Sequence, residues 1–242
     1  MTHWRKVLFA RMDKAVWGYS MFEAGRRVLA AVSGGADSMV LLDLLSRRLP
    51  VYCRGGQLCA VYVDLGFGDG AQQRCDRMAR YFEQIGIPGI LIRSEIGPYA
   101  HSDKNRENPC FLCSRIRRKK IFEAAQAADC RTIVFGHHKD DMVETLLLNM
   151  IFGREISTMP PKLSVFGGRY ELVRPLLYME ESLIKDYAGR SGIPVFSQGC
   201  PTEGRSKREY IKRMLSGLEA DFRGSRENIF QSMMRVKNDY LP

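Results

Sequence analysis

The sequence has no long hydrophobic segment. Of its 242 residues 45% are hydrophobic, yet no uninterrupted apolar run approaches the roughly 20 residues that a membrane-spanning helix needs. The N-terminus also lacks the apolar core of a signal peptide, because basic residues interrupt it at Arg5, Lys6, Arg11 and Lys14. We therefore expect a cytoplasmic protein that does not associate with a membrane.

Cysteines are few and odd in number. Seven cysteines in a chain without an export signal argue against a framework of structural disulfides, so we expect some to be ligands and the others to be buried apolar residues. Acidic residues are also in deficit, with 27 against 37 lysines and arginines, a net charge of +10. This excess favours a polyanionic partner, although charge alone does not distinguish RNA from DNA or a membrane surface.

From residue 27 onward, short apolar runs alternate with helix-length segments. This order predicts an α/β fold in which helices cover both faces of a mostly parallel sheet. Strands are predicted at residues 28–32, 58–64, 90–94, 132–135 and 172–173. Helices are predicted at residues 39–45, 71–85, 114–128, 140–152 and 180–188, and two more in the tail, separated near Gly224. We expect an amphipathic N-terminal helical extension (1–24), a core domain (25–200) and a basic helical C-terminal tail (201–242).

Two glycines and two hydroxyls join the first predicted strand to the next helix, in the segment Ser33-Gly34-Gly35-Ala36-Asp37-Ser38. Glycines let backbone amides approach an anion, and the helix N-terminus supplies partial positive charge. Asp37 is suited either to magnesium binding or to capping the helix. An ordinary capped turn is the alternative interpretation. The segment matches neither the Gly-Lys-Ser/Thr ending of a P-loop nor G-x-G-x-x-G.

Two further polar segments follow predicted strands. Asp64 ends the second strand at the edge where open α/β sheets bind ligands. Gly136-His137-His138-Lys139-Asp140-Asp141 opens a helix from the same edge. Its histidines and aspartates also allow a metal site, but adjacent histidines seldom face one ion, and Asp140 and Asp141 are placed as helix caps.

Cys110 and Cys113 form a Cys-x-x-Cys pair at the start of a predicted helix, where the helix N-terminus favours thiolates. A redox pair, a structural zinc site and two incidental buried cysteines are the competing interpretations. Zinc would need a fourth ligand, and the sequence has no second Cys-x-x-Cys. A basic run follows one turn later and is either a guide for RNA phosphates or plain surface charge. It contains Arg115, Arg117, Arg118 and Lys119.

Taken together, these motifs resemble the PP-loop ATPases, which cleave ATP between its α and β phosphates to adenylate a substrate. The segment Cys-x-x-Cys-Ser-Arg-x-Arg-Arg, followed far along the chain by Cys200, resembles the tRNA 2-thiocytidine synthetase family and, more distantly, the tRNA 2-thiouridine synthetases. The resemblance implies a single Rossmann-like PP-loop domain of the adenine nucleotide alpha hydrolase type, carrying the N-terminal helix and the C-terminal helical tail as additions.

The same resemblance implies the cofactors and their ligands. It implies a 4Fe-4S cluster with one open iron on Cys110, Cys113 and Cys200. It implies RNA contacts from Arg115, Arg117, Arg118 and Lys119. Asp37 and Asp141 are the implied catalytic residues. ATP and Mg²⁺ are expected at Ser33, Gly34, Gly35, Asp37, Ser38, Asp64, Gly136 and Asp141.

The implied reaction is thiolation of tRNA. A pyrimidine carbonyl oxygen, that of a cytidine in the anticodon loop, is adenylated and then replaced by sulfur. Sulfide or a persulfide derived from a cysteine desulfurase is the expected sulfur donor. Whether the chain forms a homodimer is left open.

The sequence departs from the family pattern at two places. Ala36 stands where the thiocytidine enzymes usually have lysine, and the second Cys-x-x-Cys near their third ligand is reduced to Cys200 alone. The zinc-binding cysteines of the thiouridine enzymes are absent. Three alternatives therefore stay open: thiolation of uridine or a small molecule, a lysidine-synthetase-like adenylating enzyme, and a non-enzymatic iron–sulfur redox sensor that binds nucleic acid.

Overall fold

Six strands form one sheet in the order β3-β2-β1-β4-β6-β5. The computed structural model describes residues 3–202, 204 and 206–240. All neighbouring strands are parallel except β5 and β6, which pair in antiparallel fashion. The strands are β1 (Arg27–Val32), β2 (Gln57–Asp64), β3 (Gly89–Arg93), β4 (Thr132–Phe135), β5 (Lys162–Val165) and β6 (Tyr170–Val173). The predicted mostly parallel α/β sheet is confirmed.

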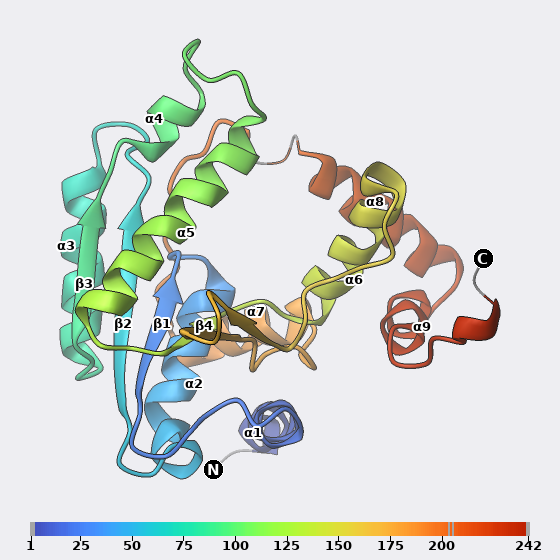
Figure 1. The fold of residues 1–242 in the computed structure, drawn as a ribbon, viewed down its shortest axis with the longest axis horizontal. Helices are drawn as coiled ribbons and strands as arrows, with labels where there is room; N and C mark the ends of the chain where they lie inside the picture. Colours follow the sequence, from blue (N-terminus) through green and yellow to red (C-terminus); the bar gives the residue numbers. More distant parts are fainter. Residues whose placement is uncertain (1–2, 203, 205, 241–242) are drawn as a thin grey trace.

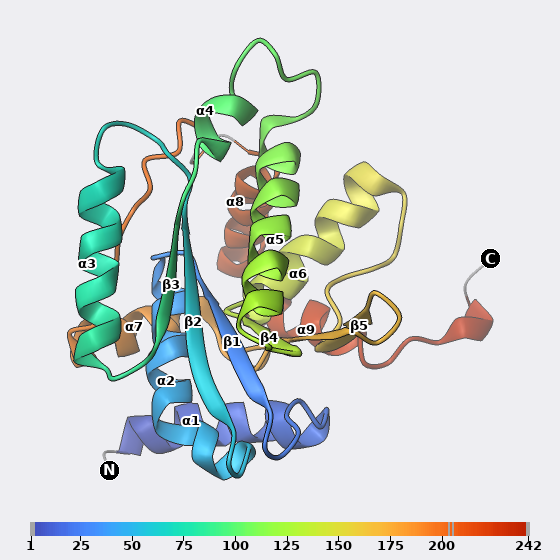
Figure 2. The same ribbon diagram turned by 60° about the vertical axis from the view of Figure 1, so that its left-hand side comes forward.

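Helices cover both faces of this sheet, and Figure 2 shows α3 and α5 on opposite sides of it. Side chains alternate along β1: Val28 and Val32 join the core formed with α1, α2 and α7, whereas Leu29 packs with α5. The helices are α1 (His3–Gly18), α2 (Ala36–Tyr52), α3 (Ala71–Gln84), α4 (Ile96–Ala100), α5 (Pro109–Ala127), α6 (Lys139–Leu148), α7 (Glu181–Ser191), α8 (Lys207–Asp221) and α9 (Ser225–Ser232).

Some elements differ from the sequence prediction. Helix α5 begins at Pro109 rather than at residue 114, because the side chain of Asn108 accepts hydrogen bonds from the backbone N–H groups of Cys110 and Phe111. Helix α6 ends at Leu148 and continues as a π-helical turn, Asn149–Gly153. Helix α4 and strand β5 were not predicted, since both are short and β5 is largely exposed, without a regular apolar pattern.

Both ends of the chain pack into the same core. Helix α1 contributes Leu8 and Met12, α8 contributes Ile211, and α9 contributes Phe230, all with at most 1% of their surface exposed. Figure 1 shows α8 beside α6, at the right of the molecule, opposite α3. The predicted extension and tail therefore share the core of the central domain, and the predicted boundaries between the three parts stay a prediction. Within the described part of the chain, no helix combines the length and apolar character required to span a membrane.

Candidate functional site

The turn between β1 and α2 is held in shape by its own hydroxyls. The Ser38 hydroxyl accepts a hydrogen bond from the Ser33 N–H at 3.0 Å and lies 3.1 Å from the Ser33 hydroxyl. The Ser33 hydroxyl in turn accepts from the Gly35 N–H at 3.3 Å. Gly34 has φ +90°, and a Cβ there would lie 3.0 Å from the carbonyl oxygen of Phe196. The turn therefore needs glycine both for its backbone conformation and for its packing.

The loop after β4 packs directly against this turn. A Cβ on Gly136 would lie 3.0 Å from the carbonyl carbon of Asp37 and 3.0 Å from the Ser38 nitrogen, so glycine permits the close approach. Between the two loops lies a cavity of about 300 Å³. Its lining includes Ser33, Asp37, Ser38, Arg117, Gly136, His137, Asp141 and Arg208. Amides, hydroxyls and arginines around one cavity suit a bound polyphosphate.

Two carboxylates stand at this cavity beside His138. The His138 Nε2 atom lies 3.6 Å from Asp37 Oδ1 and 3.4 Å from Asp141 Oδ2. Burial raises the pKa of Asp37, and its Oδ1 has no hydrogen-bond partner within the described chain. Asp37 does not cap α2, whose N-cap is Gly35. Carboxylate oxygens beside a phosphate cavity are the ligands that Mg²⁺ prefers, so these residues fit that ion.

The two aspartates in the first turn of α6 have separate tasks. Asp141 Oδ2 accepts a hydrogen bond from the His138 N–H at 3.0 Å, which closes the first turn of α6 with His138 as the N-cap. Asp140 instead accepts from the Glu181 N–H at 2.8 Å and from Arg226 at 3.2 Å. Asp140 therefore links α6 to α7 and α9, whereas Asp141 lines the cavity.

Asp64 lies in a buried network and does not line the cavity. Its carboxylate accepts hydrogen bonds from Arg74 at 2.6 and 2.9 Å and from the Gly66 N–H at 2.9 Å. Tyr62 donates to it as well. Although burial favours the neutral acid, these donors lower the pKa of Asp64. Its side chain is fully buried, so the structure places it beneath the sheet edge that was expected to expose it to a nucleotide.

Cys200 is brought back to the same sheet edge by the segment before it. The Phe196 N–H donates to the Gly34 carbonyl at 2.9 Å. The Gln198 amide donates to the carbonyls of Ser33 at 3.0 Å and Val63 at 3.2 Å, and its oxygen accepts from the Leu65 N–H at 2.8 Å. A single glutamine thus connects the ends of β1 and β2 to the chain that carries Cys200.

Two of the three predicted ligand cysteines, Cys110 and Cys200, lie at Thr202, and Cys113 neighbours both of them. The Thr202 hydroxyl lies 3.2 Å from the Cys200 sulfur and 3.6 Å from the Cys110 sulfur. Burial raises the pKa of Cys113, the neighbouring Cys200 and Cys110 raise it further, and Arg117 opposes them. All three thiols are free. Among the described residues, no group of three or more histidine, cysteine, aspartate or glutamate side chains is arranged to bind a single metal ion. Three soft sulfur donors beside a cavity fit an iron–sulfur cluster.

A second cavity, of about 390 Å³, connects these thiols with the phosphate loop. Cys110, Cys200 and Thr202 line it together with three residues that also line the first cavity. Those shared residues are Asp37, Asp141 and Arg208. Arg208, on α8, donates to Asp141 at 3.1 Å and to the Thr145 hydroxyl at 3.1 Å. The two cavities therefore meet at one wall of two carboxylates and a guanidinium group.

Comparison with known proteins agrees with this geometry. The sequence pattern of the PP-loop domain matches residues 9–218. The chain belongs to the PP-loop family. It is 34% identical to the tRNA-cytidine(32) 2-sulfurtransferase of Syntrophotalea carbinolica over 94% of this chain and 88% of that protein. It is likewise 34% identical to the protein of the same name from Dechloromonas aromatica, over 98% of this chain and 82% of that protein.

A solved structure shows the same fold. The U34-tRNA thiolase NcsA from Methanococcus maripaludis, determined with its 4Fe-4S cluster, superimposes with a TM-score of 0.78 and 21% identity. The match covers 99% of this chain and 80% of that one. The likeness shows that the two chains share this fold.

The basic run on α5 divides between two surfaces of the PP-loop domain. Arg117 is half-buried and lines the phosphate cavity, and burial lowers its pKa. Arg118 and Lys119 lie on the outer face of α5, and Arg115 forms an ion pair with Glu107 at 2.8 Å. Consecutive helical residues point about 100° apart, which separates Arg117 from its neighbours.

Several residues at this PP-loop site were missed by sequence reasoning. His137 lines the phosphate cavity, and burial lowers its pKa to about 3, so it is a neutral ring at physiological pH. Gln198 and Thr202 bring the cysteines to the cavity, but a single glutamine or threonine in a loop has no distinctive sequence pattern. Arg208 lies in the segment that the sequence predicts only as a basic helical tail. Its position eight residues after Cys200 was the one sequence feature that could have indicated a place near the cysteines.

Proposed function

We propose that the chain is an ATP-dependent tRNA thiolase that adenylates a cytidine carbonyl oxygen and replaces that oxygen with sulfur. The observation that carries the proposal is the shared wall between the two cavities. Asp37, Asp141 and Arg208 line both the phosphate cavity and the cavity of the cluster cysteines. A base held at this wall would be within reach of an adenylating group on one side and of a sulfur source on the other.

Adenylation is assigned to the phosphate cavity. The cytidine O2 atom forms a bond to the α phosphorus of ATP, and the bond from that phosphorus to pyrophosphate breaks. The amides and hydroxyls of Ser33 and Ser38 and the guanidinium groups of Arg117 and Arg208 offset the charge that develops on the departing pyrophosphate. Asp37 and Asp141 would hold the Mg²⁺ that accompanies the phosphates.

Sulfur transfer then needs no change in the oxidation state of the base. A sulfur atom at the sulfide level forms a bond to C2, and the bond between C2 and the adenylate oxygen breaks to release AMP. Sulfide supplies this atom directly, and a persulfide supplies it together with a thiol reductant. Cys110, Cys113 and Cys200 would hold a 4Fe-4S cluster, whose open iron supplies a binding site for the sulfur donor.

Cluster binding is tested by anaerobic reconstitution with iron and sulfide. Wild-type protein should gain a broad visible absorption band, and Cys110→Ala, Cys113→Ala and Cys200→Ala should each lose most of it. Cys75→Ala is the matched control, because Cys75 is buried in the main core, in a different part of the molecule. A band that survives Cys200→Ala would contradict the assignment of the three ligands.

The reaction is tested with ATP, sulfide and an unmodified tRNA transcript. Mass spectrometry of the digested nucleosides should detect 2-thiocytidine, and replacing the cytidine at position 32, the position in the relatives' name, should abolish it. Detection of thiouridine in place of thiocytidine would show that the modified base is uridine. Pyrophosphate release without any thionucleoside would leave an adenylating enzyme of the lysidine-synthetase kind, and a cluster without pyrophosphate release would favour a redox sensor.

A further inference from the structure

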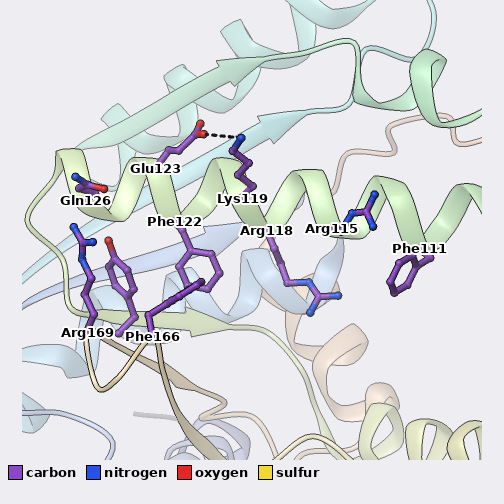
Figure 3. Close-up of a pocket in the computed structure, with 10 residues that line it drawn as sticks. Phe111, Arg115, Arg118, Lys119, Phe122, Glu123, Gln126, Phe166 and Arg169 are labelled. Atoms are coloured by element: carbon purple, nitrogen blue, oxygen red, sulfur yellow. Dashed lines mark ion pairs between the residues drawn. The ribbon is translucent and has the colours of Figure 1, made fainter. Parts of the chain in front are cut away.

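A groove of about 540 Å³ lies outside the two cavities of the proposed active site, between the outer face of α5 and the hairpin of β5 and β6. Figure 3 shows Arg118 and Phe122 projecting from α5 toward the side on which Phe166 and Arg169 lie. The lining residues are Phe111, Arg115, Arg118, Lys119, Phe122, Glu123, Gln126, Phe166, Arg169 and Tyr170.

Aromatic rings form the inner end of the groove. The centroid of Phe122 lies 5.0 Å from that of Phe166 and 5.3 Å from that of Tyr170. Tyr170 is buried at 6% exposure, whereas Phe166 is 67% exposed. The buried tyrosine thus fixes one side of the cluster, and Phe166 leaves a ring face available for another planar group.

The hairpin holds Phe166 in an unfavourable backbone conformation. Phe166 has φ +52°, a left-handed conformation that a bulky side chain rarely adopts, and it precedes Gly167 with φ +64°. Val165 pairs with Tyr170, so four residues form the tip of the hairpin. Local backbone strain of this kind is commonly retained at sites of function.

The charge of the groove is strongly positive. Arg115, Arg118, Lys119 and Arg169 line it, and Glu123 is the one acidic residue among the described residues of its lining. The Arg169 guanidinium lies 5.5 Å from the centroid of the Tyr170 ring. Guanidinium groups interleaved with aromatic rings are the combination that binds the phosphates and unstacked bases of single-stranded nucleic acid.

We propose that this groove binds a single-stranded segment of the RNA substrate, with an unpaired base stacked on Phe166 and phosphates at Arg118 and Arg169. The inference rests on the proposed function and adds a second contact area for the same partner. Helix α5 connects the two, because Cys110 and Cys113 lie in its first turn and Phe122 lies near its other end. An RNA loop can therefore place one base at the active site and a flanking nucleotide in the groove.

The test measures binding of a fluorescein-labelled anticodon stem-loop RNA by fluorescence anisotropy, beside a blunt RNA duplex that has the stem but no loop. Phe166→Ala should weaken stem-loop binding about 5- to 100-fold, as expected for losing one stacked base, and should hardly affect duplex binding. Phe166→Trp should restore affinity. Phe222→Ala is the matched control, since Phe222 is equally exposed at 67% and lies beyond α8, away from the groove.

The arginine–phosphate contacts are tested by the salt dependence of RNA affinity. Arg169→Ala should lower the slope of log affinity against log salt by about 0.7, the contribution of one phosphate contact on a single strand. Arg190→Ala, an exposed arginine on α7, should leave that slope unchanged. In a thiolation assay, Phe166→Ala should raise KM for tRNA and leave kcat near the wild-type value, because the ring contacts no reacting atom.

The outcomes separate this inference from the proposed function. If wild-type protein thiolates tRNA and Phe166→Ala binds the stem-loop as tightly as wild type, the groove assignment is wrong while the function stands. Equal losses in Phe166→Ala and Phe222→Ala would mean non-specific apolar adhesion and would also overturn it. Unchanged RNA affinity with loss of self-association in sedimentation would assign the groove to a second copy of the chain. Failure of wild-type protein to bind any tRNA would overturn both.

Discussion

Asp37 and Asp64 carry the same functional group at the same edge of the sheet, and their surroundings give them different tasks. Asp37 lines both cavities, and its Oδ1 has no hydrogen-bond partner among the residues that the structure describes. Asp64 is fully buried, and its oxygens accept hydrogen bonds from Arg74, Gly66 and Tyr62. Asp37 is therefore available to a ligand, whereas Asp64 stabilises the end of β2.

The available carboxylates should be essential for the first chemical step. Asp37→Asn and Asp141→Asn should each lower pyrophosphate release about 100- to 1,000-fold, because each removes one negative charge that would hold the Mg²⁺ of the departing phosphates. Asp186→Asn is the control, since Asp186 is exposed and pairs with Arg190 on the same helix. Release rates within a few-fold of wild type, in variants with unchanged unfolding midpoints, would remove these residues from the mechanism.

The buried pair of Asp64 and Arg74 should determine stability. Arg74→Ala should lower the free energy of unfolding by about 3–5 kcal/mol, because it leaves a buried carboxylate without its main partner. The folded pKa of Asp64 is lowered, so the stability that it contributes is present above about pH 4 and is lost as the pH falls toward the folded pKa.

Urea unfolding across this pH range checks both statements about the pair. The difference in stability between wild type and Asp64→Asn should shrink on acidification. A difference that grows as the pH falls would have the wrong sign for a depressed pKa and would contradict the assignment.

At the scale of elements, the phosphate cavity depends on how closely the β4–α6 loop approaches the first turn of α2. Gly136→Ala should separate the two loops, because the new Cβ would lie 3.0 Å from backbone atoms of Asp37 and Ser38. Pyrophosphate release should fall about 10- to 100-fold through misplacement of the reacting groups.

Gly189→Ala is the matched control for this substitution. Gly189 lies within α7, where a Cβ would meet nothing within 4 Å, so alanine should leave release unchanged and raise stability by up to about 1 kcal/mol. If Gly136→Ala releases pyrophosphate at the wild-type rate, the close approach of the two loops is not needed for catalysis.

At the scale of the whole molecule, one core joins the two ends of the chain. Phe230 on α9 is 1% exposed and belongs to the same core as Leu8 and Met12 of α1. Phe230→Ala should therefore cost about 3–5 kcal/mol of unfolding free energy and should affect the entire fold.

Two probes of urea unfolding test this coupling. Tryptophan fluorescence reports on α1, which carries Trp4 and Trp17, and far-ultraviolet circular dichroism reports on all helices. Their transitions should coincide in wild type and shift together in Phe230→Ala, while Phe222→Ala, 67% exposed, should shift neither. A separate early transition seen only by circular dichroism would mean that α8 and α9 unfold independently.

Local chemistry explains why much of this protein could be predicted from its sequence. The order of apolar runs predicts the parallel sheet, because strand and helix periodicities are local properties. The phosphate loop and the cysteine pair are also recognisable from the sequence, because Ser33 to Ser38 and Cys110 to Cys113 are each contiguous segments.

Only the tertiary structure decided which side chains reach the site and which are buried by neighbours. The pattern of β2 places Asp64 at the end of the strand, but only the fold shows that Arg74, ten residues later, pairs with it. Arg208 reaches Asp141 because α8 packs beside α6. Cys200 lies near Cys110 because Gln198 binds the segment before it to the ends of β1 and β2. Such contacts between distant residues depend on packing of the whole chain, and packing, unlike periodicity, has no local signal in the sequence.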